Sequence, residues 1–279
     1  MSLPSTLSMG AVKLKVSDME KVVAFYRDGV GLKVLADSGN SVVLGHGAAA
    51  ALIVEHEPQL RHASDNEAGL FHSAFLFDTQ VELAAAVASV AQKYPTSFTG
   101  SADHLVSEAF YFDDPEGNGV ELYFDRARTE WSWADGHIAM DTLPLDPNAY
   151  LSTHFGGVPP QPSTIGHVHL SVGSIEQAHD FYVNTLGFDM TLNWGGTALF
   201  VSAGGYHHHM AMNVWRSRGA GRRQPTLGLG EVAIELDAKE DVEALSERLS
   251  DFDVSTRDDG ARVSVDDPWG NLLTVSVRS

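Results

Sequence analysis

Alternating apolar and polar residues mark a strand near the start of the chain, and the same pattern returns in the second half. Residues 12–16 read VKLKV and residues 168–172 read VHLSV, as expected for a half-buried strand. A helical pattern with a Phe-Tyr pair follows each stretch and ends at a glycine, which predicts a left-handed helix cap. The matching positions are Phe25-Tyr26 with Gly31, and Phe181-Tyr182 with Gly187.

A second repeat lies later in each half of the chain. Residues 113–118 read DDPEGN and residues 266–271 read DDPWGN, a pattern typical of a turn between two strands. A strand and a helix are predicted before each turn, at Ala74–Phe77 with Val81–Lys93 and at Val232–Leu236 with Lys239–Leu249. The two repeats together predict four βαβββ modules, with approximate spans 8–58, 68–125, 163–218 and 228–279.

These modules place the chain in the α+β class. Two half-barrel domains are expected, an N-terminal pair of modules over 1–125 and a C-terminal pair over 163–279. The segment between them, 126–162, is rich in Pro, Gly and Trp and is predicted to be a linker. The length of 279 residues suits two domains of ordinary size.

Charge and composition exclude several function classes. The formal charge is −19 with a pI near 4.9, so the chain has no basic surface for nucleic acid or an anionic membrane. The chain has no cysteine, which excludes disulfides, thiolate metal sites and a cysteine nucleophile. Its start does not have the pattern of a signal peptide, so a cytoplasmic protein is expected. Thirteen histidines point to metal binding through nitrogen and oxygen.

One aligned position differs chemically between the modules. The residue just before the apolar pattern of the first strand is, in chain order, Ala11, His72, His167 and Glu231. The strand after the Asp-Pro turn carries Glu121 in module two and Thr274 in module four. Two histidines and one carboxylate form the facial triad of non-heme Fe(II) oxygenases. We therefore predict that modules two and three enclose a metal site of His72, His167 and Glu121. Their counterparts Ala11, Glu231 and Thr274 are expected to line a non-metal pocket or a packed core.

Two further contrasts distinguish the same two modules. Residues Ala48–Ala51 of module one align with Tyr206–His209 of module three, so small apolar residues correspond to a polar cluster. Tyr111, ten residues before Glu121, aligns with Ser264 of module four. The duplication is therefore interpreted as one functional site and one that has lost its function.

The modules resemble those of the vicinal-oxygen-chelate superfamily, which contains glyoxalases, bleomycin-resistance proteins and extradiol dioxygenases. The resemblance covers nearly the whole chain, through Gly166–Leu170, Phe181-Tyr182 with Leu186–Phe188, and Asp114–Tyr123. Two more specific stretches, Asp103–Ala109 and Ser202–His209, resemble a two-domain catechol 2,3-dioxygenase branch.

This resemblance implies roles for individual residues. His72 and His167 match ligands at strand starts, and Glu121 matches the ligand of the last strand. His208 falls where extradiol enzymes carry a histidine that acts as acid and base without binding the metal. Tyr111 and His104 fall near the pair that contacts the substrate oxygens. In the best-known extradiol enzymes the site lies in modules three and four, so its placement in modules two and three requires a different pairing of modules.

The resemblance implies an Fe(II)-dependent extradiol dioxygenase that cleaves catechol or a substituted catechol with O₂. Mn(II) accepts the same ligand set. The expected partners are the small aromatic diol and O₂, and a homo-oligomer is left open. His154 in the linker could cap the site.

One alternative function is a glyoxalase-like isomerase or lyase. Such an enzyme typically takes a fourth protein ligand from the module-three strand, and residues 210–215 offer no carboxylate there. The other alternative is a metal-free binding protein of the bleomycin-resistance kind.

Overall fold

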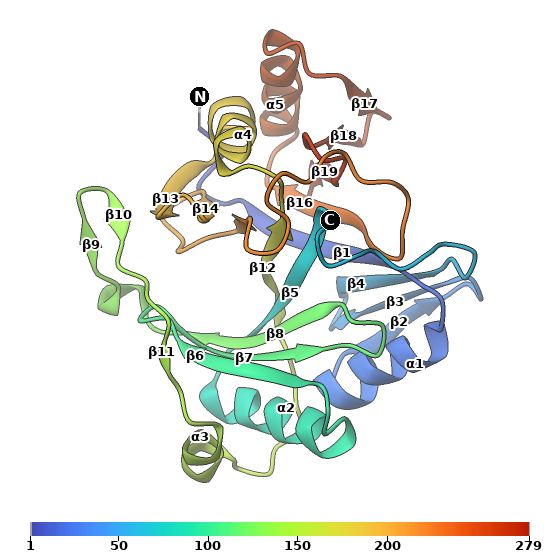
Figure 1. Ribbon diagram of the computed structural model, residues 1–279, viewed down its shortest axis with the longest axis vertical. Helices are drawn as coiled ribbons and strands as arrows, with labels where there is room; N and C mark the ends of the chain where they lie inside the picture. Colours follow the sequence, from blue (N-terminus) through green and yellow to red (C-terminus); the bar gives the residue numbers. More distant parts are fainter. Residues whose placement is uncertain (1, 279) are drawn as a thin grey trace. The chain divides into compact units, whose positions relative to one another are not determined.

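The computed structural model describes residues 2–278 and contains the four modules in chain order (Figure 1). Module one comprises β1 (Ser8–Val16), α1 (Met19–Ala24), the π-helix η1 (Phe25–Val30), β2 (Lys33–Asp37), β3 (Ser41–His46) and β4 (Ala49–His56). Module two comprises β5 (Gly69–Phe77), α2 (Gln80–Lys93), β6 (Phe98–Asp103), β7 (Ser107–Asp113) and β8 (Gly119–Asp125). Module three comprises β12 (Thr164–Ser171), α4 (Ile175–Ala178), the π-helix η3 (His179–Thr185), β13 (Asp189–Trp194), β14 (Ala198–Ser202) and β15 (Met210–Asn213). Module four comprises β16 (Gly228–Leu236), α5 (Lys239–Asp251), β17 (Thr256–Asp258), β18 (Arg262–Asp266) and β19 (Leu272–Val277).

The segment predicted to be a linker contains short elements of its own. They are η2 (Arg128–Glu130), β9 (Trp133–Ala134), β10 (His137–Ile138), β11 (Leu143–Pro144) and α3 (Pro147–His154). The predicted α+β class with four βαβββ modules in half-barrel form is confirmed. Within residues 2–278 the helices are all too short or too polar to cross a bilayer.

The chain forms two compact units, each made of segments that are distant in sequence. Unit 1 contains the chain up to Lys13, Arg61–Phe71, and everything from His167 onward. Unit 2 contains Leu14–Leu60 and His72–Gly166. Three strands, β1, β5 and β12, pass from one unit to the other. The domain boundaries at 1–125, 126–162 and 163–279 stay a prediction.

The strands of each unit follow the order expected for these modules. In unit 2 the order β11-β6-β7-β8-β5 places module two in one sheet, and β1-β4-β3-β2 places module one in another. In unit 1 module three has the order β12-β15-β14-β13, and module four has the order β17-β18-β19-β16, with β1 beside β16. In each of modules two, three and four the first strand runs parallel to the last, as β5 does with β8.

Local sequence explains the long helix of module two. The Thr79 hydroxyl accepts a hydrogen bond from the Glu82 backbone N–H and donates one to the Glu82 carboxylate, so the helix begins with a capped first turn. Its buried face is made of small and branched residues, among them Ala84–Ala86, Val87 and Val90. Figure 1 shows this helix lying along the sheet of β6, β7 and β8.

The Phe-Tyr motif and the Asp-Pro turn prove to be two parts of one interaction. In unit 2 the Tyr26 hydroxyl donates to Asp114 Oδ2 at 3.3 Å, and in unit 1 Tyr182 donates to Asp267 Oδ2 at 3.0 Å. Both carboxylates are buried. The retention of both motifs in both halves therefore has a structural cause: each tyrosine joins one module's helix to the turn of the next module.

The glycine caps are confirmed, but the helix geometry before them was not predicted. Gly31 has φ 100° and Gly187 has φ 95°, in the left-handed region that favours glycine. The helix widens into a π-helix over Phe25–Val30 and over His179–Thr185. Because the widening occurs in both copies, it belongs to the module and is not a property of one site.

The Asp114 carboxyl gives the fold a specific pH dependence. Burial raises its pKa from 3.8 to about 6, although hydrogen bonds from Asn118, Glu116 and Tyr26 act to lower it. The folded state therefore holds this proton more tightly than the unfolded state. We expect the carboxyl's contribution to the free energy of unfolding to fall as pH rises from about 4 to about 6, by at most about 3 kcal/mol.

Urea unfolding of the wild type and of Asp114→Asn, at pH values from 4 to 7, measures this contribution. The free energy of unfolding of the wild type minus that of the variant should decrease across the window. An increase across the same window would show that ionised Asp114 is the form that the fold favours.

Candidate metal centre

His72 and Glu121 meet in unit 2 on two parallel strands. The register of β5 and β8 pairs Ala74 with Glu121, which places the strand-start histidine near this carboxylate. His72 Nε2 lies 2.9 Å from Glu121 Oε2, and the two residues are only 6% and 2% exposed. Two of the three predicted ligands are therefore adjacent and shielded from water.

Tyr111 continues from this pair toward His104. It lies opposite Glu121 in the antiparallel register of β7 and β8. Burial, and then the nearby charge of Glu121, raise the pKa of Tyr111 well above its usual value. Tyr111 is therefore a neutral hydrogen-bonding group beside the candidate ligands.

His104 completes this chain of contacts. Its Nε2 lies 2.7 Å from the Tyr111 hydroxyl, and its Nδ1 lies 2.7 Å from the backbone oxygen of Asp141. Because a carbonyl oxygen only accepts, Nδ1 carries a proton. The neutral ring can then accept from Tyr111 at Nε2, whereas the imidazolium form would donate there.

The turn that carries His104 is held in place by Arg126. The Arg126 guanidinium donates to Asp103 at 2.8 Å and to Glu108 at 3.0 Å, on either side of the turn. Leu105, at its tip, has φ 69°, a conformation that is unfavourable for a leucine. Arg126 is a positioning residue that sequence reasoning missed, because only the folded hairpin brings its partners together.

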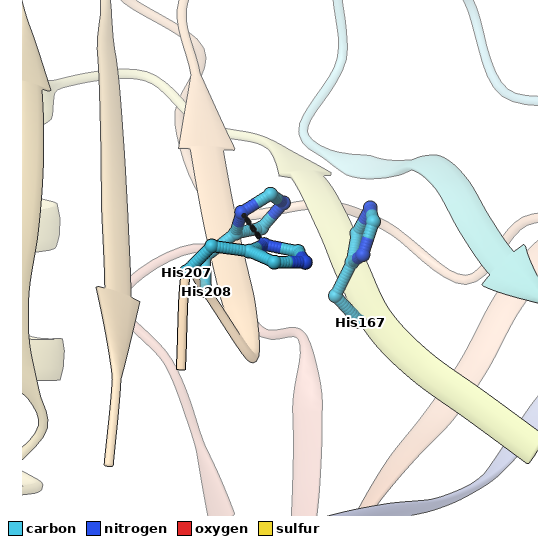
Figure 2. A group of neighbouring side chains, drawn as sticks. All are labelled: His167, His207 and His208. Atoms are coloured by element: carbon cyan, nitrogen blue, oxygen red, sulfur yellow. Dashed lines mark hydrogen bonds between the residues drawn. The ribbon is translucent and has the colours of Figure 1, made fainter. Parts of the chain in front are cut away.

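His167 and the module-three histidines form a cluster in unit 1 (Figure 2). His167 is 1% exposed, and its ring centroid lies 4.2 Å from that of His208 and 5.8 Å from that of His207. The Nδ1 atoms of His207 and His208 are hydrogen-bonded at 2.7 Å. Each of the three histidines offers a nitrogen within 4.8 Å of the others, so this group could also hold a cation.

The loop that carries His208 is fixed by its neighbours. The Thr191 hydroxyl donates to the His207 backbone oxygen at 2.7 Å, and the Ala203 N–H donates to His209 Nδ1 at 3.2 Å. The Tyr206 ring packs on both of these histidines. His208 is thus the histidine of the run that lies beside His167, while its neighbours hold the loop.

His169 and His154 have contacts that do not depend on a ligand. His169 Nε2 lies 3.0 Å from the side-chain nitrogen of Asn213, and its ring is surrounded by aromatic side chains, namely Phe71, Phe200 and Trp215. His154, at the end of α3, packs against Tyr150 with ring centroids 4.6 Å apart. The predicted role of His154 as a cap over the site stays a prediction.

The counterpart positions in unit 1 carry a different set of contacts. The register of β16 and β19 pairs Ala233 with Thr274, as β5 and β8 pair Ala74 with Glu121. The Thr274 hydroxyl donates to Glu231 Oε1 at 2.7 Å, and Lys13 Nζ lies 3.2 Å from Glu231 Oε2. A lysine ammonium therefore neutralises this carboxylate, a contact that the sequence alignment did not predict.

Comparisons with known proteins agree with this arrangement of modules. A model of the glyoxalase/bleomycin resistance protein/dioxygenase superfamily matches residues 8–122 and 164–275. The chain belongs to this superfamily. The resemblance found in the sequence is therefore confirmed, including its more specific branch, because a protein of Bacillus subtilis (strain 168) named catechol-2,3-dioxygenase is 33% identical over 275 residues. That alignment covers 96% of each chain.

Solved structures of the superfamily have the same fold. A Bacillus subtilis structure provisionally assigned as a dioxygenase matches with a TM-score of 0.69 and 14% identity, over 99% of this chain and 86% of that one. Glyoxalase I from Zea mays matches with a TM-score of 0.59 and 15% identity, over 98% and 92% of the two chains. At these identities the structures support the superfamily fold and leave the choice of reaction to the site.

The Lys13–Glu231 pair predicts that modules one and four hold no metal. The ammonium already supplies the positive charge, and a single carboxylate cannot hold a divalent ion against water. We expect Glu231→Gln to leave the metal content of the purified protein unchanged, as measured by plasma emission spectroscopy. A second ion per chain that disappears in Glu231→Gln would show that the module pairs have kept the same chemistry.

Proposed function

We propose that this protein is an Fe(II)-dependent extradiol dioxygenase that cleaves catechol or a substituted catechol with O₂, and that His72, Glu121 and His167 bind the metal. The observation that carries the proposal is the buried His72–Glu121 pair at 2.9 Å. The counterpart pair in the duplicated module is a threonine and a glutamate with its own lysine. The full-length relative named catechol-2,3-dioxygenase supports the reaction class.

Contacts within unit 2 support the inclusion of His167. A Cβ on Gly166 would lie 1.6 Å from the Tyr123 hydroxyl, so only glycine fits beside this ring. Tyr123 lies two residues after Glu121 on β8, and His167 is the residue that follows Gly166. The residue that precedes His167 therefore packs against the strand that carries the carboxylate.

Contacts within unit 1 bring together residues next to the two histidines. Phe71 directly precedes His72 on β5, and its ring centroid lies 4.9 Å from that of His169. His169 lies two residues after His167 on β12, on the same face of the strand. These contacts place the start of β5 beside β12, and the direction of the His72 side chain is given by its own contact with Glu121.

The chemistry of the donors fits a divalent ion with open coordination positions. Two imidazoles and one carboxylate are the facial set of non-heme Fe(II) oxygenases. All three residues are buried, which disfavours an uncompensated carboxylate and favours a bound cation. When bound, the metal would supply Lewis acidity and a common site for the diol and O₂.

The chain's own residues would position the diol and move its protons. The Tyr111 hydroxyl and His104 form a hydrogen-bonded pair at 2.7 Å that can orient a substrate oxygen. His208 lies beside His167, and an imidazole can take a proton from a catechol hydroxyl near neutral pH. His208 is buried, and Tyr111 and His104 are partly buried, which limits the access of water to the proton transfer.

Two alternatives are disfavoured by particular side chains. A glyoxalase-like site would need a further carboxylate from β15, whose residues Met210–Asn213 contain none. A metal-free binding protein has no need of a buried His72–Glu121 pair. The histidine cluster of His167, His207 and His208 remains a rival metal-binding set, and the experiments below separate it from the proposed one.

Protein purified without oxygen, followed by metal analysis and addition of catechol in air, tests the proposal directly. We expect one Fe(II) per chain and a yellow semialdehyde product. A fully iron-loaded protein that leaves catechol and methyl-substituted catechols unchanged would contradict the proposed reaction.

Replacement of each proposed ligand tests the metal site itself. We expect Glu121→Ala and His72→Ala each to lose most of the bound metal while the fold is retained, because modules one and four tolerate other residues at these positions. Glu231→Ala is the matched control for the carboxylate and should keep the metal. Full retention in Glu121→Ala, together with loss in a His207→Ala protein, would assign the ion to the rival histidine cluster.

His208→Phe and Tyr111→Phe test the proton-transfer roles. We expect His208→Phe to keep iron and to lower kcat by about 10²–10⁴-fold, the usual contribution of a positioned acid or base. Tyr111→Phe should lower kcat less, because a phenol hydrogen bond orients the substrate without taking up its proton. Single-turnover assays at measured iron content check both values, and unchanged turnover in His208→Phe would exclude it from the chemistry.

A further inference from the structure

His207 is the most completely buried member of the His207–His209 run. It is 0% exposed, against 8% for His208 and 7% for His209. The aligned stretch of module one consists of alanines at Ala48–Ala51, so the module itself does not require a buried imidazole here. The His207 ring points its Nδ1 at His208 Nδ1, at 2.7 Å (Figure 2).

The 2.7 Å contact restricts how the two rings can be protonated. A hydrogen bond between two imidazole nitrogens needs a proton on one of them and a lone pair on the other. If His207 donates, a neutral His208 carries its own proton on Nε2 and has no lone pair there. If His208 donates from Nδ1, its Nε2 has a free lone pair and can act as a base.

We propose that His207 accepts the Nδ1–H of His208 and so holds His208 in the tautomer whose Nε2 can take a proton from the substrate. This inference rests on the proposed function, since it assigns a partner to the acid–base residue of that site. His207 is a positioning residue: it acts through His208. The arrangement follows the general logic of a base whose orientation and tautomer are set by a third group.

Two hydrogen bonds hold the His207 loop without the His207 ring nitrogens. The backbone of His207 is held by Thr191 through the carbonyl oxygen, and the loop is closed by the Ala203–His209 hydrogen bond. Neither hydrogen bond involves the His207 imidazole, although the Tyr206 ring packs against it. Its Nδ1 is the atom bonded to His208, so replacing that atom with another acceptor separates packing from the state of His208.

Protonation of the ring nitrogens can be observed without any turnover. In metal-free protein with ¹⁵N-labelled histidine, two-bond ¹H–¹⁵N correlations show which nitrogen of each ring carries the proton, and a His208→Phe sample identifies the His208 signals. We expect His208 to be protonated at Nδ1 in the wild type and in His207→Asn, whose side-chain oxygen can accept in place of Nδ1. In His207→Leu, which has no acceptor, the proton should move to Nε2.

The same two variants have distinct kinetic consequences in the iron-loaded enzyme. We expect His207→Leu to lower kcat for catechol by about 10–100-fold, the usual effect of losing a residue that orients a functional histidine. The KM and the iron content should stay within about twofold of the wild type. His207→Asn should recover most of the lost turnover, which a simple change in packing would not explain.

Three results would overturn the inference. A wild-type His208 protonated at Nε2 would show that His207 is the donor. Equal losses of kcat in His207→Asn and His207→Leu would show that the acceptor atom is irrelevant. Loss of iron in His207→Leu would make His207 a ligand. If the wild type does not cleave catechol but shows the Nδ1 tautomer, the proposed function fails while the role of His207 stands.

Discussion

A tyrosine hydroxyl bound to a buried carboxylate organises each half of this protein. In unit 2 the Asp114 carboxylate receives Tyr26 and also the backbone N–H groups of Glu116 and Asn118. These bonds fix the turn directly before β8, and Glu121 lies three residues after that turn. The position of the candidate metal ligand therefore depends on a tyrosine that lies in a different module. The same bond in unit 1, between Tyr182 and Asp267, fixes the strand that carries Thr274.

A buried or partly buried carboxylate constrains both versions of the site, and each satisfies the constraint differently. An ionised carboxylate away from water needs a positive partner or several hydrogen bonds. Glu231 has Lys13 and Thr274, whereas Glu121 lies beside His72. The Lys13 ammonium is already paired with Glu231 and offers no coordination position, whereas a metal ion with open positions can bind a substrate. This difference explains how one duplicated framework can hold an ion pair in one place and the proposed metal site in another.

The sequence predicted the fold and the His72–Glu121 pair because both depend on repeated local patterns. Strand periodicity, the turn motifs and the aligned strand starts are visible without tertiary structure, so the modules and the parallel strands of module two follow from them. The sequence did not predict three side-chain contacts: the His207–His208 bond, the Lys13–Glu231 pair, and the bonds of Arg126 to Asp103 and Glu108. Each depends on where a side chain points after folding, which local sequence patterns do not show. The π-helices were missed because this geometry is rare and each covers only six or seven residues, too few for a separate periodicity to be read from the sequence.

The passage of β1 from one unit to the other has a consequence for synthesis of the chain. The first strand begins in unit 1, where the Arg278 guanidinium donates to the Thr6 backbone oxygen across 272 residues. Unit 2 needs no residue beyond Gly166, so it can form while the ribosome is still translating the second half. The N-terminal strand has no such opportunity: Leu7, Met9 and Val12 are buried in the finished protein, yet their partners in unit 1 are the last to be made. During translation these apolar side chains wait for partners from the second half of the chain, and a chaperone that binds short apolar segments could cover them in that interval.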